Sequence, residues 1–578
     1  MRHIASAVFC FFCSAIFAQT AIYNTPFEGN NQVTATYAEV MDFYKKMDAG
    51  YLQMRLIEAG PTDSGKPLHL AVISKSGEFD PAKLRAKGKL ILLVNNAIHP
   101  GEPEGVDASM VLCRDLLQKP DYQPILENIV IVFIPMYNID GALNRGCCSR
   151  ANQNGPQEYG FRGNAKNLDL NRDFIKCDTR NARSFTQIFN RWQPDVLVDN
   201  HTSNGADYQY TMTLIHTQAD KLGGRLGDFL RDDMLDAIYS DMVQRGWPIS
   251  PYVHPVRESP EDGISHMLDA PRFSTGYAAL HHTIGFMPET HMLKAFSERY
   301  AITRALVESV LAFSVANGTQ IQGLRSAARQ EAAARKLWPV HWQLDYSRPR
   351  MTRFKGFKAV YGPSKLGNYQ RLSYDRNQPW EEDIACYERC VADISVDTPK
   401  AYVVPQAWRE VIDRLSMNKL RMHRLERDEE RQVRTWRISA VQTRATAYEG
   451  HMFHDKLSLT AQLETCMLRA GDHIVPLDQP RARYAVETLE PQGHDSFFRW
   501  GFFNSVLEKK ENYSDYVFED LALEMLEQEP LLAARFVQWK AAHPALLADQ
   551  RAVLDFIFAN CQRYNEPGWM RYPVLSLL

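Results

Sequence analysis

A continuous apolar run leads directly into a histidine and a glutamate in the stretch KLILLVNNAIHPGEPEGVDASMVLCRDLLQ, residues 89–118. Residues 89–94 are typical of a short strand that is covered on both faces. Residues 103–118 space their apolar side chains at helical intervals and carry acidic residues in the first turn. The stretch therefore predicts a buried strand, a loop that carries His99 and Glu102, and a helix.

Strand-like and helix-like segments alternate in the same way on both sides of this stretch. Further strands are expected at residues 129–134, 195–199 and 283–287, and helices at residues 178–192 and 295–316, the last capped by Asn317-Gly318. This pattern predicts an α/β domain over residues 22–320, with a mixed, mostly parallel sheet and helices on both faces. Because such sheets bind ligands at the carboxyl ends of their strands, residues that follow strands are candidate site residues.

The last part of the chain, residues 330–578, mixes short β-prone segments with helices. Strands are expected at residues 402–405, 434–446, 457–463 and 483–488, and helices at residues 327–337, 421–434 and 520–528. The segment 421–434 is expected to be a solvent-exposed helix because its positive and negative charges largely balance. We infer a second, β-containing domain of unknown role over residues 330–578.

The composition is that of an ordinary globular protein. Of the 578 residues, 45% are hydrophobic and 23% are charged, which excludes a disordered chain and a coiled coil. The net charge is -3, from 66 Lys and Arg against 69 Asp and Glu. A chain so close to neutrality gives no electrostatic reason to expect a nucleic-acid partner.

The N-terminal residues 1–18 have the features of a secretory signal peptide. A short basic start precedes an uncharged, apolar run that is too short to span a bilayer, and Ala18-Gln19 is a plausible cleavage point. An uncleaved anchor or a buried helix is the alternative. We expect a secreted or periplasmic protein without an integral membrane segment once the signal is removed.

Eight cysteines remain after removal of the signal peptide, too few over this length for a disulfide-stapled scaffold. The neighbours Cys147 and Cys148 are not expected to pair with each other, and Cys177 or Cys113 are better candidate partners. The pairing itself does not follow from the sequence.

Three candidate site residues follow predicted strands of the first domain. His99 and Glu102 lie three residues apart after one strand, and His201 follows another. Two histidines and one glutamate that leave a coordination position open form the ligand set of a hydrolytic zinc site. Glu289, after the strand at 283–287, is placed to act as a general base. A structural role for each histidine, or a metal-facing His291, is the alternative.

A larger set of motifs resembles the zinc carboxypeptidase family, the carboxypeptidase A-like metallopeptidases. The set consists of His99-x-x-Glu102, Asn138-Ile-Asp-Gly141, Arg150-Ala-Asn152, Asp169-Leu-Asn171-Arg172, His201 and Glu289, in the order of the family. The resemblance covers roughly residues 40–320, and we expect an exported, bacterial type of enzyme. It identifies no counterpart for residues 330–578.

The resemblance implies a role for each matching residue. His99, Glu102 and His201 are then ligands of one Zn²⁺ per chain, and Glu289 is the general base that deprotonates the zinc-activated water. Arg150 is the arginine that stabilises the oxyanion, Asn171 and Arg172 bind the terminal carboxylate of the substrate, and Asp169 supports the first histidine.

The chemistry of these side chains agrees with the implied roles. A guanidinium can stabilise a developing oxyanion, and its planar fork can bind a carboxylate with two parallel hydrogen bonds. A carboxylate behind a ligating histidine fixes the tautomer of the ring. The alternatives are a surface position for Arg150 and a structural ion pair of Arg172 with Asp169 or Asp173.

One element of the family pattern has no clear match. The family carries a mobile tyrosine that folds over bound substrate, and Tyr277 is the nearest candidate, although its separation from Glu289 is shorter than expected. Tyr252 is the other candidate. We assign the role to Tyr277.

The sequence thus predicts a zinc-dependent metallocarboxypeptidase that hydrolyses the C-terminal peptide bond of peptides with a free C-terminal carboxylate. Two alternatives use the same site: an exported carboxypeptidase for peptidoglycan peptides, and an N-acyl amino acid deacylase. A third alternative is an inactive binding protein that uses residues 330–578 as an interaction module.

Overall fold

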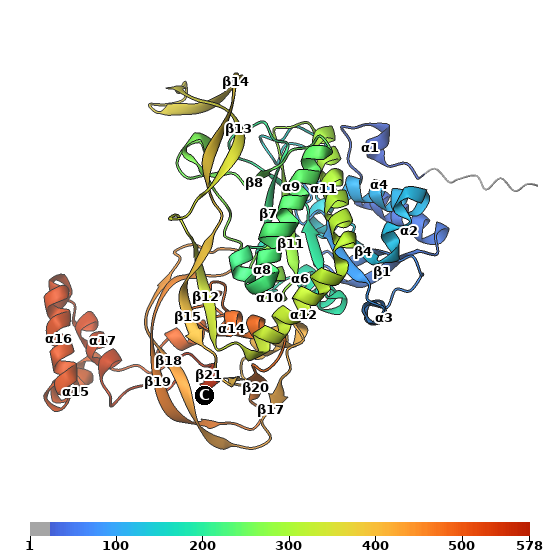
Figure 1. Cartoon of the computed structure of the whole chain (residues 1–578). Coiled ribbons are helices and arrows are strands. Elements are labelled where there is room, and N and C mark those ends of the chain that lie inside the picture. Colours follow the sequence, from blue (N-terminus) through green and yellow to red (C-terminus); the bar gives the residue numbers. More distant parts are fainter. Residues whose placement is uncertain (1–22) are drawn as a thin grey trace, which may run out of the picture.

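The computed structural model describes residues 23–578 (Figure 1). The expected signal peptide, residues 1–18, lies outside the described residues. The first part of the chain forms a nine-stranded sheet in the order β1-β2-β4-β3-β5-β11-β7-β8, with β6 paired to β11. Its strands are β1 (Met54–Pro61), β2 (Pro67–Ile73), β3 (Leu90–Asn95), β4 (Ile129–Ile134), β5 (Val196–Asp199), β6 (His201–Ser203), β7 (Met212–His216), β8 (Ser250–Pro251) and β11 (Ile284–His291).

The centre of this sheet is parallel and its margins are mixed. The neighbours β4 and β3, β3 and β5, and β5 and β11 all run parallel. At one margin β1 and β2 pair antiparallel, and at the other β7 runs antiparallel to β11. The predicted mixed, mostly parallel sheet is therefore confirmed.

Helices cover both faces of the sheet because the apolar side chains of its strands point alternately to two separate cores. Leu92 of β3 belongs to the core shared with α2, α4, α9 and α11, and Leu93 belongs to the core shared with α6 and α10. Burial of such a side chain contributes roughly 1.5–3 kcal/mol to folding. The helices are α2 (Tyr37–Gly50), α4 (Glu104–Gln118), α6 (Arg180–Trp192), α9 (Leu235–Gln244), α10 (Ser274–Leu280) and α11 (Phe296–Ala316).

The end of α11 differs from the prediction. The helix ends at Ala316 as expected, but Asn317 has a φ of -116° and not the left-handed conformation of a glycine-type cap. A second helix, α12 (Gly318–Ala334), begins at once, so the helical connector starts earlier than residue 327.

The later part of the chain contains three further sheets. Its main elements are β12 (Leu337–Leu344), β13 (Arg350–Pro363), β14 (Gln370–Tyr387), β15 (Cys390–Asp397), β16 (Ala401–Val404), β17 (His423–Arg424), β18 (Glu429–Thr443), β19 (His454–Leu468), β20 (His473–Pro476), β21 (Leu575–Leu577), α13 (Arg409–Met417) and α14 (Ala482–Leu489). One sheet has the order β17-β20-β16-β21-β18-β19, β12 pairs with β15, and the β13–β14 hairpin joins the short strands β9 (His254–Pro255) and β10 (Ile264–Ser265).

Two predictions for this part are wrong. Residues 421–434 contain β17 and the beginning of β18, where cross-strand pairing with β20 and β19 outweighs the helix preference of Arg and Glu. Residues 483–488 lie in helix α14. Its apolar residues have helical spacing, but the β-prone Tyr484, Val486 and Thr488 favour a strand in the prediction.

The core under α6 and α10 continues into the later part of the chain. Leu93 and Tyr277 share one cluster of buried apolar residues with Trp338, Tyr402 and Trp500. The proposed boundary near residues 320–330 stays a prediction.

Two units project from this body in Figure 1: the β13–β14 hairpin, and the helices α15 (Asp515–Gln528), α16 (Pro530–Ala542) and α17 (Gln550–Asn560), which share a small core of their own. Among residues 23–578, no helix combines the length and apolar character needed to cross a membrane.

The disulfide expectation is wrong. Cys147 and Cys148 are bonded to each other, and Cys148 has a φ of +75°. Cys113 is buried in the core under α4, and the Cys177 thiol lies 3.6 Å from the hydroxyl of Thr186. Both of these better candidates are held in packed interiors as free thiols.

Candidate metal centre and active site

The predicted ligands meet at the carboxyl ends of the central strands. His99 lies on the loop after β3, His201 begins β6 directly after β5, and Glu289 lies in β11. Strand β6 continues the register in which β5 pairs with β11, so that His201 lies opposite Glu289. The parallel pairing of three neighbouring strands therefore places the loop, the histidine and the glutamate at one edge of the sheet.

His99, Glu102 and His201 form a compact, buried group. One ligand atom from each lies within 4.8 Å of the other two. Glu102 lies between the rings, with its Oε1 3.2 Å from His99 Nδ1 and its Oε2 3.2 Å from His201 Nδ1. All three side chains are 2% exposed. The two imidazole nitrogens and the carboxylate oxygens thus converge on one point.

A carboxylate holds each histidine from behind. His99 Nε2 lies 2.8 Å from Asp169 Oδ1, and His201 Nε2 lies 3.0 Å from Asp199 Oδ2. These bonds direct both Nδ1 atoms toward Glu102, and His99 Nδ1 is buried without a hydrogen-bond partner. A buried imidazole nitrogen that lacks a partner, beside a second imidazole and a carboxylate, fits the N and O donor set of a zinc site.

Arg150 lies against the ligand group. Its guanidinium donates hydrogen bonds to Glu102 Oε1 at 2.8 Å and to the carbonyl of Thr202 at 2.9 Å. Gly101 makes this approach possible, because a Cβ at that position would lie 2.7 Å from Arg150 Cδ. Burial opposes ionisation of Glu102, but the charges on His99 and Arg150 hold its pKa well below the usual range. Glu102 is therefore a carboxylate in this site.

Glu289 has the opposite electrostatic character. Burial raises its pKa to about 7, the charge on His201 opposes this rise, and the charge on Glu102 adds to it. A carboxyl group with a pKa near 7 can both accept and release a proton at neutral pH. The alternative ligand His291 is not available, since its Nε2 lies 2.9 Å from the Ala206 carbonyl and its Nδ1 accepts from Leu293 N–H.

Asp169, Asn171 and Arg172 share one tight turn, the 3-10 segment η3 (Leu170–Arg172). The carboxylate of Asp169 accepts from the N–H of Asn171 at 2.8 Å, which fixes the start of the turn. Among residues 23–578, the one ion pair of Arg172 is a long one with Asp169, at 3.8 Å, and its guanidinium lies 4.5 Å from the centre of the Phe273 ring. Its side chain is 24% exposed. This arginine keeps hydrogen-bonding capacity for a ligand.

The structure does not bring Tyr277 to the ligand group, and its assignment as the mobile tyrosine is wrong. Tyr277 is 0% exposed in α10, and its hydroxyl donates to Asn418 Oδ1 at 2.7 Å. Its ring packs against Phe174 and Phe189. A side chain with these partners cannot fold over a substrate without opening the core.

Tyr252, the other candidate, lies within the electrostatic reach of the site. Burial raises the pKa of its hydroxyl, the charges on Glu289 and Glu102 raise it further, and the charge on Arg172 lowers it. Tyr252 directly follows β8, and its N–H donates a hydrogen bond to the carbonyl of Leu214.

Four residues at the site are absent from the predicted set. Asp199 lies two positions before His201 at the end of β5, a spacing that could have identified it. Arg162 donates to Asp169 Oδ2 at 3.0 Å. Tyr448 accepts a hydrogen bond from Arg172 Nε at 3.1 Å, and the carboxylate of Glu449 accepts from Asp169 N–H at 2.8 Å. The last two come from the distant β18–β19 connection, which no local sequence pattern links to the site.

Known proteins with similar sequences are carboxypeptidases. A model of the zinc carboxypeptidase family matches residues 40–209. Carboxypeptidase 2 of Trichophyton tonsurans is 24% identical over 440 residues, which cover 72% of this chain and 74% of that protein. Carboxypeptidase 2 of Trichophyton rubrum is 23% identical over 504 residues, which cover 81% and 84%.

Among solved structures, a metallo-carboxypeptidase from Burkholderia cenocepacia matches with a TM-score of 0.37 and 15% identity, over 48% of this chain and 69% of that one. The sequence relatives above are fungal, so the expected bacterial type is not confirmed. The family match over residues 40–209, the carboxypeptidase relatives and the buried His99–Glu102–His201 group together support a metallocarboxypeptidase similar to the zinc carboxypeptidase family.

Proposed function

We propose that the protein is a zinc-dependent carboxypeptidase that removes the C-terminal residue of peptides with a free C-terminal carboxylate. One observation carries the proposal. The buried ligand group of His99, Glu102 and His201 lies beside a glutamate of raised pKa, Glu289, which is paired in register with His201. One Zn²⁺ per chain would be held by these three ligands.

Glu289 is the proposed general base. The chemistry that a bound Zn²⁺ supplies here is Lewis acidity, which lowers the pKa of water and polarises a carbonyl. Glu289 takes the proton from the attacking water and delivers it to the nitrogen of the departing amino acid as the C–N bond breaks. Its buried position, which raises its pKa to about 7, favours both transfers near neutral pH.

Arg150 and Arg172 are proposed to bind the two negatively charged groups of the reacting peptide. Arg150 lies 2.8 Å from Glu102 and would place its charge beside the developing oxyanion. Arg172, with Asn171 in the same turn, would bind the terminal carboxylate. Tyr252 replaces Tyr277 as the proposed tyrosine that contacts bound substrate.

The proposal extends to the two ends of the chain. Residues 1–18 serve as a signal peptide, so that the enzyme is exported. Residues 22–320 carry the catalytic site and residues 330–578 form the additional β-containing part.

Zinc content and substrate choice test the proposal together. The protein from residue 19 onward is expected to contain one zinc per chain, which His201→Ala loses, and to release free amino acids from peptides. Parallel digestions of peptidoglycan peptides and of N-acyl amino acids distinguish the alternatives. If the protein contains zinc but hydrolyses only peptidoglycan peptides or N-acyl amino acids, the corresponding alternative replaces the proposed substrate. Absence of zinc from the wild-type protein would contradict the proposal.

A further inference from the structure

A cavity lies at the opposite end of the sheet from the metal centre, where the strands begin. It has a volume of about 460 Å³, within the range of small-molecule sites. His281 and Thr283 line it just before β11 begins, whereas Glu289 lies further along the same strand. The cavity is therefore separate from the proposed catalytic site.

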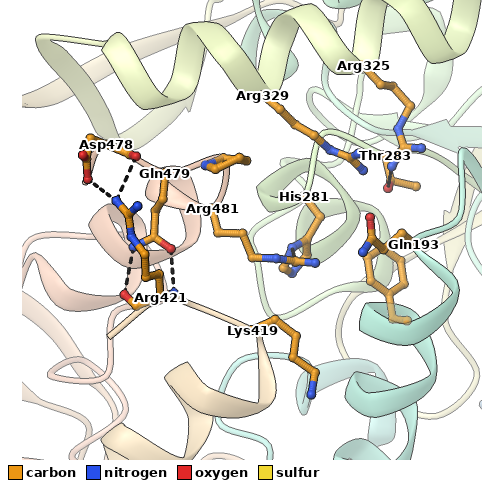
Figure 2. A pocket seen from close by; sticks show the side chains of 12 residues that line it. Gln193, His281, Thr283, Arg325, Arg329, Lys419, Arg421, Asp478, Gln479 and Arg481 are labelled. Atoms are coloured by element: carbon orange, nitrogen blue, oxygen red, sulfur yellow. Dashed lines mark hydrogen bonds and ion pairs between the residues drawn. The ribbon is translucent and has the colours of Figure 1, made fainter. Parts of the chain in front are cut away.

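The lining of this cavity is strongly basic. Five of its twelve lining residues are cationic and one is acidic. The cationic residues are Arg325, Arg329, Lys419, Arg421 and Arg481, and the acidic one is Asp478 (Figure 2). Two of the cations are neutralised locally. Arg421 pairs with Asp478, and Arg325 pairs with Asp195.

The other three cations have no carboxylate partner. Among residues 23–578, Arg329, Lys419 and Arg481 form no ion pair, and the one hydrogen bond of the Arg481 side chain is to His281 Nδ1, at 2.6 Å. In Figure 2, Arg325 and Arg329 extend from helix α12 toward Thr283 and His281, and Arg481 reaches His281 from the other side. Uncompensated like charges that share a cavity repel one another.

The electrostatics agree with this arrangement. The charge on Arg325, followed by burial and the charge on Arg481, lowers the pKa of Arg329 to about 9. Burial and then the charge on Arg481 hold the pKa of His281 well below its usual range. Of the two ring nitrogens of His281, Nε2 is buried without a hydrogen-bond partner. The positive charge of the cavity thus exceeds its negative charge, because the one lining carboxylate, Asp478, is already paired with Arg421.

We propose that this cavity binds a small organic anion that carries a phosphate or sulfate group. A tetrahedral oxyanion supplies the missing charge, and the planar forks of Arg329 and Arg481 can each donate two parallel hydrogen bonds to it. Lys419 adds an exposed positive charge at the same cavity. Because α12 supplies Arg329 and the segment before α14 supplies Arg481, a bound anion would also link these two parts of the chain.

Calorimetric titration of the zinc-loaded protein with inorganic phosphate, and separately with inorganic sulfate, tests the proposal. Chloride at equal ionic strength serves as the reference. The double variant Arg329→Gln/Arg481→Gln is expected to bind the preferred anion at least tenfold more weakly, with unchanged peptidase activity. Arg427→Gln, which removes one exposed charge outside the cavity, is expected to bind it as the wild type does. Preference for phosphate or for sulfate identifies the group on the natural ligand.

Two outcomes would overturn the proposal. In the first, the wild type would bind neither phosphate nor sulfate better than chloride. In the second, the double variant would bind the anion as tightly as the wild type, which would place the anion elsewhere, for example at the metal centre. Thermal unfolding gives an independent readout. Without oxyanion, Arg329→Gln is expected to raise the melting temperature by relieving repulsion, and phosphate is expected to stabilise the wild type more than the double variant. If folding of the double variant fails, Lys419→Gln at the exposed edge replaces it, with a smaller loss of affinity expected.

Discussion

Asp199 shows how a single carboxylate sets the orientation of a ligating ring. Its Oδ2 lies 3.0 Å from His201 Nε2, and its Oδ1 accepts from Asn95 Nδ2 at 2.9 Å. With both oxygens in use and 0% exposure, Asp199 cannot turn without breaking a buried hydrogen bond. The direction of His201 Nδ1 toward Glu102 follows from this fixed carboxylate.

Asp199→Asn is expected to weaken zinc binding by about 10–100-fold, the usual effect of losing the carboxylate behind a histidine ligand. The amide retains the shape of the carboxylate but cannot accept from both His201 and Asn95. Competition with a metal chelator measures the affinity. Asp107→Asn, which removes a buried carboxylate on α4 away from the ligating histidines, is the control, and equal affinities in the two variants would contradict the orienting role.

Glu289→Gln is expected to retain zinc and to lower kcat/KM by about 10²–10⁴-fold, because the amide cannot take a proton from water. Steady-state kinetics on a free-acid peptide, with zinc content measured on the same sample, provide the test. Glu298→Gln, at an exposed position in the first turn of α11, is the matched control. Activity near that of the wild type would rule out Glu289 as the base.

At the scale of single elements, α4 follows the loop of His99 and Glu102 and carries a buried acid, Asp107. Burial raises the pKa of Asp107 to about 7, although the hydroxyl of Thr34 and the N–H of Ala35 donate hydrogen bonds to it. The pKa lies above its unfolded value near 3.9, so the folded chain holds the proton more tightly. The resulting stabilisation is present below about pH 4 and is lost as the pH rises to about 7.

Asp107→Asn removes this pH dependence, since its amide stays uncharged, can donate to Thr34 and can accept from Ala35. The free energy of unfolding of the wild type is expected to fall by up to about 4 kcal/mol more than that of the variant between pH 4 and pH 8. Chemical denaturation at both pH values measures the difference. Parallel losses in the two proteins would show that Asp107 is ionised in the folded state.

The elements that could be predicted from the sequence are those with a strong local pattern. The apolar run at residues 129–134 coincides with β4, and the spacing of apolar residues gave α4 and α11. Helix α14 is missed because its β-prone residues Tyr484, Val486 and Thr488 favour a strand. Likewise, the short separation of Tyr277 from Glu289 gave no sign that Asn418 holds its hydroxyl in the core.

At the scale of the whole molecule, the later part of the chain completes the site. Tyr448 and Glu449, from the connection between β18 and β19, contact the turn that carries Asp169 and Arg172. Arg272, just before Phe273, pairs with Asp495 at 2.6 Å. These long-range contacts join segments more than 200 residues apart, which is why sequence patterns alone gave the ligands but not the surroundings of Arg172.

Tyr448→Phe is expected to lower kcat/KM about 2–10-fold for free-acid peptides, the effect of one lost hydrogen bond to a guanidinium that must be positioned. For amidated peptides, kcat/KM is expected to stay unchanged, since these peptides do not use the charge of Arg172. Tyr513→Phe, in the separate bundle of α15, is the control. Equal losses on both kinds of peptide would indicate a general structural role for Tyr448.

The most direct test of the central claim is the ratio of kcat/KM for one peptide with a free C-terminal carboxylate to that of its amidated form, measured on the zinc-loaded wild type and on Arg172→Ala. The ratio is expected to be large in the wild type and to fall by at least tenfold in the variant, because alanine cannot make the two hydrogen bonds that Arg172 donates to the carboxylate. A ratio near one in the wild type, or an unchanged ratio in Arg172→Ala, would contradict the claim.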